Sequence, residues 1–127
     1  MIINFTKMEG CGNDYVYIEG ISQRIPQDIK PELVRKLSDR HFGIGGDGVI
    51  FINDSQIADF EMEMYNADGS RGEMCGNGIR CVGKFVYDYG MTNKTQITVE
   101  SFKKIKYLTL YPEDGFVKRV RVNMGPA

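Results

Sequence analysis

Cys75 stands directly before Gly76-Asn77-Gly78, where a predicted helix begins. A thiol at the N-terminal end of a helix faces unpaired backbone N–H groups and the positive end of the helix dipole. Both favour the thiolate and lower the pKa of the cysteine below its usual value of about 8.5. The same N–H groups can receive a carboxylate, and glycines let it approach closely. The segment therefore combines a candidate base with a candidate anion site, although a helix-capping role without chemistry stays open.

The other residues that could take part in catalysis or bind a ligand are less clearly indicated by the sequence. Cys81 lies about 240° around the helix from Cys75, at about 100° per residue, so we expect its thiol to point into the core. Cys11 lies in a glycine-flanked turn, and its role stays open. Residues 43–48 match G-x-G-x-x-G, but a predicted helix precedes them and a predicted strand follows, the reverse of a dinucleotide site. His41 is expected to be a cation at a helix end or a packing residue. The cysteines lack the companion ligands of a zinc site.

The composition is that of a single globular domain. The chain has 127 residues, of which 42% are hydrophobic and 26% are charged, and its formal net charge is −1. This charge gives no electrostatic basis for binding nucleic acid or an anionic membrane surface. No apolar run approaches the ~20 residues of a membrane span, and the N-terminus does not resemble a signal peptide. An odd number of cysteines without a C-x-x-C pair predicts reduced thiols and a cytoplasmic location.

The hydrophobic pattern predicts the elements that must position Cys75. Strands are expected at residues 2–6, 15–19, 49–53, 59–65, 96–101, 105–111 and 117–123, and helices at residues 31–40 and 76–89. In the strand at residues 59–65, Phe60, Met62 and Met64 share one side and Glu61, Glu63 and Tyr65 the other, which predicts a half-buried strand. The order of strands and helices predicts an α+β fold in which a mixed sheet wraps around a central helix.

Four blocks of sequence, in order, resemble the diaminopimelate epimerase family. They are Phe5-Thr6-Lys7-Met8 with Gly12-Asn13-Asp14, then Arg40-His41-Phe42-Gly43-Ile44-Gly45, then Tyr65-Asn66-Ala67-Asp68-Gly69-Ser70, and then Met74-Cys75-Gly76-Asn77-Gly78. The resemblance covers the whole chain but only the N-terminal half of the family's length. It implies that residues 1–121 form one epimerase lobe, an open barrel around a central helix, and that residues 122–127 begin the linker to a C-terminal lobe that is absent here.

The resemblance also implies a chemistry. It assigns Cys75 as one of two catalytic cysteines, and Asn13, Asn66, Gly76 and Asn77 as substrate-binding residues, the last two at the carboxylate of the reacting carbon. A thiolate and a thiol on opposite faces of an α-carbon can invert it without metal or pyridoxal phosphate, so no cofactor is expected. The implied reaction interconverts LL- and meso-diaminopimelate, a step of lysine and peptidoglycan precursor synthesis.

The chain departs from the family pattern in two places. Gly48 stands where some members carry a glutamine that contacts substrate, and the second catalytic cysteine belongs to the half of the family sequence that the chain lacks. We therefore expect the isolated chain to turn over negligibly, and we expect its partners to be a small amino acid, the C-terminal lobe and, in one alternative, a second copy. Two further hypotheses stay open: a related thiol racemase for another amino acid such as histidine, and a non-catalytic fragment that associates through its exposed lobe surface.

Overall fold

A computed structural model of the chain describes residues 4–8, 15–41, 43, 45–72, 76–101 and 104–123. Within these residues, seven strands form a single sheet whose spatial order follows the chain, and two α-helices and one short 3₁₀ helix accompany it. The elements are β1 (Thr6–Met8), β2 (Tyr15–Glu19), η1 (Gln27–Ile29), α1 (Lys30–Ser38), β3 (Gly48–Asn53), β4 (Phe60–Asn66), α2 (Gly76–Asp88), β5 (Gln96–Ser101), β6 (Lys104–Glu113) and β7 (Phe116–Asn123).

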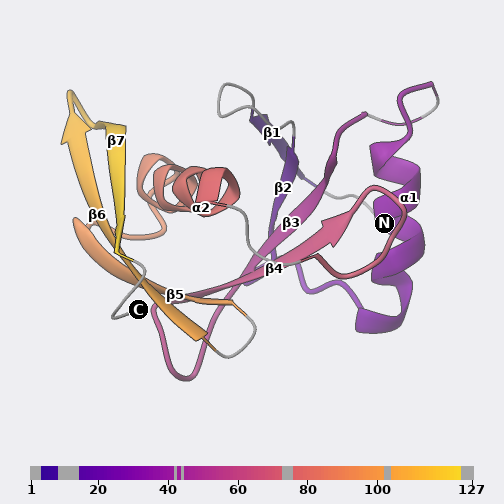
Figure 1. Ribbon diagram of the computed structural model, residues 1–127, viewed down its shortest axis with the longest axis horizontal. Helices are drawn as coiled ribbons and strands as arrows, with labels where there is room; N and C mark the ends of the chain where they lie inside the picture. The colour runs from indigo at the N-terminus through magenta and orange to yellow at the C-terminus, as the bar shows by residue number, and fades with distance from the viewer. Residues whose placement is uncertain are drawn as a thin grey trace.

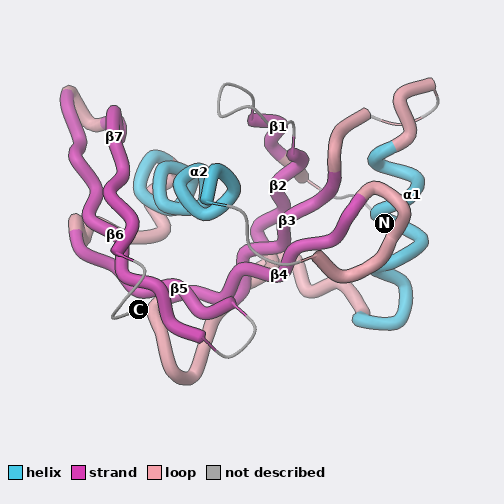
Figure 2. The backbone as a smooth tube through the Cα atoms, viewed as in Figure 1, coloured by secondary structure: helices cyan, strands magenta, loops and turns pink. Residues whose placement is uncertain are grey.

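The sheet curves around α2, while α1 lies on its outer face (Figure 1). Figure 2 shows the strands as one continuous arch with α2 inside it. The predicted mixed sheet around a central helix is therefore confirmed. Strands β2 and β3 are parallel, as are β4 and β5, whereas the other neighbouring strands are antiparallel.

The topology explains why the two helices lie on opposite faces. The segment with α1 connects the parallel strands β2 and β3, and α2 connects the parallel strands β4 and β5. Such crossovers are right-handed in nearly all proteins. Because β4 and β5 run opposite to β2 and β3 while the sheet order continues in one direction, a crossover of the same hand must place its helix on the other face.

Each face of the sheet buries its own apolar cluster. Between the sheet and α2 lies the larger cluster, with Ile79, Val82, Phe85 and Val86 of the helix against alternate residues of the strands. The smaller cluster packs Val34 of α1 against the other side of β2, β3 and β4. The first cluster includes Cys81, which is 6% exposed, as its predicted orientation requires.

The prediction that β4 is half buried is wrong. The two sets of side chains do alternate between faces, but Glu63 and Tyr65 are buried as well, at 4% and 3% exposure. The reason is that η1 and α1 cover the second face of β4, a contact that the pattern within the strand cannot reveal.

The N-terminal strand also differs from the prediction. Of residues 2–6, the structure describes residues 4–6, and only Thr6 belongs to β1, which continues to Met8. The backbone N–H and C=O groups of Asn4 bond to the side chain of Gln23 instead of to a neighbouring strand. Asn4 N donates to Gln23 Oε1 at 2.7 Å, and Gln23 Nε2 donates to Asn4 O at 2.9 Å.

At the other end of the described chain, Val122 and Asn123 still pair with β6. The strand β7 thus ends at Asn123, where the predicted strand at residues 117–123 ends.

Candidate functional site

One edge of the sheet collects the segments that the sequence singled out. Tyr15, Gly48 and Asn66 lie side by side in register across β2, β3 and β4. Because β2 and β3 are parallel, both begin at this edge, and the antiparallel β4 ends there. The described chain therefore enters this edge at Tyr15, and the turn after Asn66 leaves from it.

The turn after β4 is held by its own hydrogen bonds. Asn66 N donates to Ser70 O at 2.8 Å, Gly69 N donates to Asn66 O at 2.9 Å, and Asn66 Nδ2 donates to Ser70 Oγ at 3.1 Å. Asp68 accepts hydrogen bonds from the backbone N–H and the hydroxyl of Ser70, and these bonds lower the pKa of Asp68. The side chain of Asn66 is thereby fixed at the sheet edge.

The chain then returns along β4 towards α2. Gly72 N donates to Met64 O at 2.9 Å, four residues before α2 begins at Gly76. The first turn of α2 is tied to β2 as well, because the buried Tyr17 hydroxyl donates to Gly78 O at 3.3 Å. The predicted helix start is confirmed, and the Tyr17 contact places Gly78 of that first turn beside β2, two residues along the strand from Tyr15.

The predicted site residues divide into two groups. Asn66 ends β4, and Gly76 and Asn77 open α2, where the side chain of Asn77 is not described. Cys75 and Asn13, and with them Cys11, lie outside the described residues, so their assignments stay predictions.

Gly48 is constrained by its neighbours. A Cβ atom at this position would lie 2.2 Å from Tyr65 O, a distance that cannot form without moving the backbone, and 3.2 Å from Tyr15 Cε1, a tight contact. The residue at this position of the edge therefore supplies no side chain, and a glutamine would require a different spacing between β3 and β4. Residues 43–48 do follow a helix and lead into a strand, as predicted.

One cavity among the described residues lies away from this edge. It has a volume of about 560 Å³ and is bounded by Tyr17, Phe85, Tyr89 and Met91 together with the N-terminal segment, towards the C-terminal end of α2. None of the predicted site residues lines it. The described residues contain no group of three or more His, Cys, Asp or Glu side chains that could hold a metal ion.

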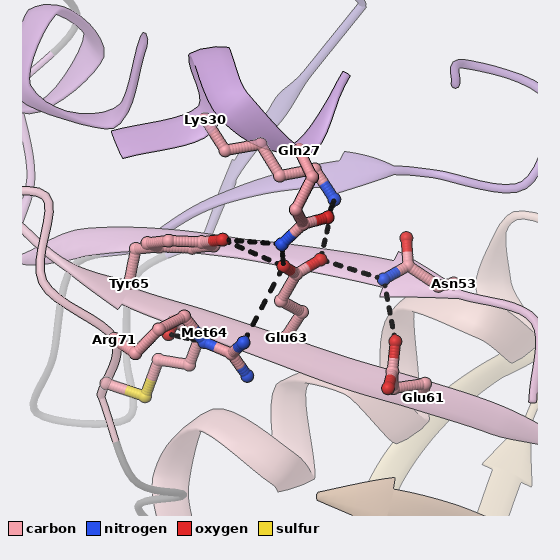
Figure 3. Close-up of polar contacts among 8 residues, drawn as sticks. All are labelled: Gln27, Lys30, Asn53, Glu61, Glu63, Met64, Tyr65 and Arg71. Atoms are coloured by element: carbon pink, nitrogen blue, oxygen red, sulfur yellow. Dashed lines mark hydrogen bonds and ion pairs between the residues drawn. The ribbon is translucent and has the colours of Figure 1, made fainter. Parts of the chain in front are cut away.

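Sequence reasoning missed a buried polar cluster on the α1 face of the sheet, centred on Glu63 (Figure 3). Lys30 Nζ lies 2.6 Å from Glu63 Oε1, and both side chains are almost fully buried. The other hydrogen-bond donors to the carboxylate are Gln27, Asn53 and Tyr65. No local pattern pairs Lys30 with Glu63, because 33 residues separate them.

Burial alone would raise the pKa of Glu63, because it favours the neutral acid. The hydrogen bonds from Lys30, Gln27, Tyr65 and Asn53 outweigh burial and lower this pKa to about 2. Burial and the neighbouring carboxylate raise the pKa of Tyr65 to about 12. At neutral pH, the cluster is therefore an ionised carboxylate with a protonated phenol beside it.

Comparison with known sequences decides the family. The sequence model described as diaminopimelate epimerase matches residues 5–127. The chain belongs to the diaminopimelate epimerase family. It is 56% identical over 123 residues to the diaminopimelate epimerase of Agathobacter rectalis, covering 97% of the chain and 42% of that protein. It is 57% identical over 126 residues to the diaminopimelate epimerase of Leptospira biflexa, covering 98% of the chain and 44% of that protein. The chain thus spans less than half the length of these relatives.

Solved structures with low sequence identity share the fold. Methylitaconate-delta-isomerase superimposes with a TM-score of 0.76 at 18% identity, covering 91% of the chain and 36% of that protein. A probable proline racemase from Agrobacterium radiobacter superimposes with a TM-score of 0.74 at 17% identity, covering 95% of the chain and 41% of that protein. The chain therefore shares its fold with part of each of these two proteins. In the part of the chain that the structure describes, neither α1 nor α2 has the length and apolar content of a transmembrane span.

Proposed function

We propose that this chain supplies one half of the active site of a cofactor-independent epimerase that interconverts LL- and meso-diaminopimelate. One observation supports the proposal above all: the chain leaves the sheet edge at Asn66, returns along β4 to Gly72, and forms α2 from Gly76, the residue that follows Cys75 in the sequence. The names of the relatives support the substrate, since diaminopimelate epimerases are 56% and 57% identical to the chain.

In the proposed mechanism, the backbone N–H groups that open α2 hold the substrate carboxylate next to the reacting carbon, with Gly76 and Asn77 as the binding residues. The amides of Asn13 and Asn66 can donate to a carboxylate and accept from an ammonium group, so they suit the rest of the amino-acid head group. The thiolate of Cys75 removes the α-proton from one face, and a thiol on the opposite face returns a proton to the carbanion. In the reverse direction, Cys75 is the acid.

The second thiol must come from outside this chain, because we expect it in the part of the family sequence beyond the region that the chain matches. We propose residues 1–121 as the N-terminal lobe, residues 122–127 as the start of the inter-lobe linker, and the C-terminal lobe as the partner that completes the site. The two thiols must stay reduced, which favours a cytoplasmic location.

A direct test joins this chain to the C-terminal part of the Leptospira biflexa relative and measures exchange of the α-hydrogen of diaminopimelate in D2O. The chimera should exchange it, and the 127-residue chain alone should do so negligibly. Cys75→Ala should lower the chimera's rate by about 10²-fold or more, the usual scale for loss of a general acid–base group. Cys81→Ala, on the same helix but in the core, is the matched control. Equal rates for the two variants would refute the role of Cys75.

The same assay separates the other hypotheses. Exchange with histidine but not with diaminopimelate would transfer the proposal to a different amino-acid racemase. A non-catalytic, self-associating role is favoured by one observation, the exposure of Phe5 and Tyr89 beside the apolar cavity, at 47% and 60%. Sedimentation of the isolated chain tests it, since a monomer at high concentration would contradict association between copies.

A further inference from the structure

Arg71 lies in the segment between β4 and α2, and its side chain contacts the α1 face of the sheet. The backbone of Arg71 forms a β-bridge with Tyr65, which places it antiparallel to the end of β4. Its Nε donates to Met64 O at 3.3 Å, and its guanidinium lies over the ring of Tyr65, 5.3 Å from the centroid. The same guanidinium reaches the buried carboxylate of Glu63, with Nη1 at 3.8 Å from Oε2 (Figure 3).

Glu63 is a rigid point of attachment. Its side chain is 5% exposed, and it accepts from four donors besides its contact with Arg71. Two of these donors, Gln27 and Lys30, belong to η1 and the start of α1. A carboxylate with this many partners cannot follow a movement of the loop, so Arg71 connects the loop to the sheet and to α1 together.

The two halves of the loop depend on Arg71 to different degrees. The first half is closed by the hydrogen bonds between Asn66 and Ser70, to which Arg71 contributes nothing. In the second half, the described residues Arg71 and Gly72 are joined to β4 by Gly72 N and by the contacts of the Arg71 side chain. Loss of the Arg71 side chain should therefore loosen the start of α2 more than it disturbs Asn66.

We propose that Arg71 is a positioning residue, which, by bracing the β4–α2 loop against the buried carboxylate of Glu63, sets the place of the α2 N-terminus at the site edge. The effect on the reaction rests on the proposed function. The guanidinium is partly in water, with the side chain 42% exposed, so its removal should change the geometry of the loop far more than the stability of the fold.

Arg24 provides a matched control. Arg24 forms an exposed ion pair with Asp54, in which Nη2 lies 3.6 Å from Oδ2. It precedes η1 in the chain and is not part of the β4–α2 loop. Arg24→Ala and Arg71→Ala thus each remove one arginine from one ion pair, whose carboxylate is exposed for Arg24 and buried for Arg71. Arg71→Lys keeps the charge but cannot donate to Met64 O and Glu63 at once from a planar group.

The first experiment does not require an active enzyme. In the isolated chain, alkylation of Cys75 by iodoacetamide is followed by mass spectrometry of the peptides, with Cys81 as the buried internal reference. Arg71→Ala should change the rate constant at Cys75 by about threefold or more, because the thiolate fraction depends on alignment with the helix end. Arg71→Lys should behave in the same way, and Arg24→Ala should match the unaltered chain. Equal rate constants for Arg71→Ala and Arg24→Ala would overturn the proposal.

The second experiment uses the active chimera. Arg71→Ala should lower kcat by about tenfold or more, since small displacements of a reacting group cost up to about 10²-fold, and it should also raise KM, because the same helix start holds the substrate carboxylate in the proposed mechanism. A rise in KM at constant kcat would contradict the proposal. If the unaltered chimera is inactive, the proposed function fails, and the alkylation experiment still decides the role of Arg71.

Discussion

The Glu63–Lys30 pair makes a quantitative prediction about stability and pH. The pKa of Glu63 falls from its usual 4.5 to about 2 in the folded chain. This difference of about 2.5 pKa units, at about 1.36 kcal/mol each, corresponds to about 3 kcal/mol of folding free energy. Because the folded pKa lies below the unfolded one, this contribution is present above the unfolded pKa, near 4.5, and is lost as the pH falls through the folded pKa near 2.

The substitution Glu63→Gln should remove that pH dependence and lower the stability at neutral pH. It leaves the ammonium of Lys30, which is 6% exposed, without its carboxylate, and breaking a buried pair from one side costs about 3–5 kcal/mol. The double substitution Lys30→Met with Glu63→Gln should recover most of this loss, because no buried charge is left unpaired.

Urea unfolding followed by far-ultraviolet circular dichroism, at several pH values between neutral and about pH 2, measures both effects. The stability difference between the unaltered chain and Glu63→Gln should shrink by about 3 kcal/mol between about pH 5 and pH 2. Taking the difference cancels the other carboxyl groups whose pKa is lowered, such as Asp59. A difference that stays constant over this pH range would refute the assignment of Glu63 as an ionised, buried acid.

Two other substitutions test the geometry of the site edge by urea unfolding. Gly48→Ala should destabilise the chain by about 1–3 kcal/mol, because the new Cβ would lie 2.2 Å from Tyr65 O. As a control, the Cβ of Gly115→Ala would meet no atom within 4 Å, but Gly115 has a φ of 85°, so this substitution should cost about 1 kcal/mol of stability. If Gly48→Ala costs less than that, β3 and β4 can separate to admit the new Cβ. Tyr17→Phe should cost about 1 kcal/mol through the lost hydrogen bond to Gly78 O, and no loss would mean that the bond does not hold α2.

The sequence predicted much of the local structure of this protein, and the place of Cys75 in it stays a prediction. The strand at residues 15–19 and the strand at residues 96–101 were predicted with the bounds that the structure has, and α2 begins at the predicted Gly76. These features depend on the spacing of apolar residues and on glycines at element ends, which neighbouring residues decide. The motif Cys75-Gly76-Asn77-Gly78 therefore pointed to a thiol before a helix without any knowledge of the fold.

The tertiary structure alone decided which segments meet. Strand pairing in register brought Tyr15, Gly48 and Asn66 into one row, and no pattern within a strand specifies its neighbour's register. It also buried Glu63, although a glutamate on the second face of an alternating strand normally indicates exposure to solvent. A period of two shows which side chains share a face, but whether another element covers that face depends on distant residues. Here Lys30 and Gln27 cover it, and their contact with Glu63 exists only in the folded chain.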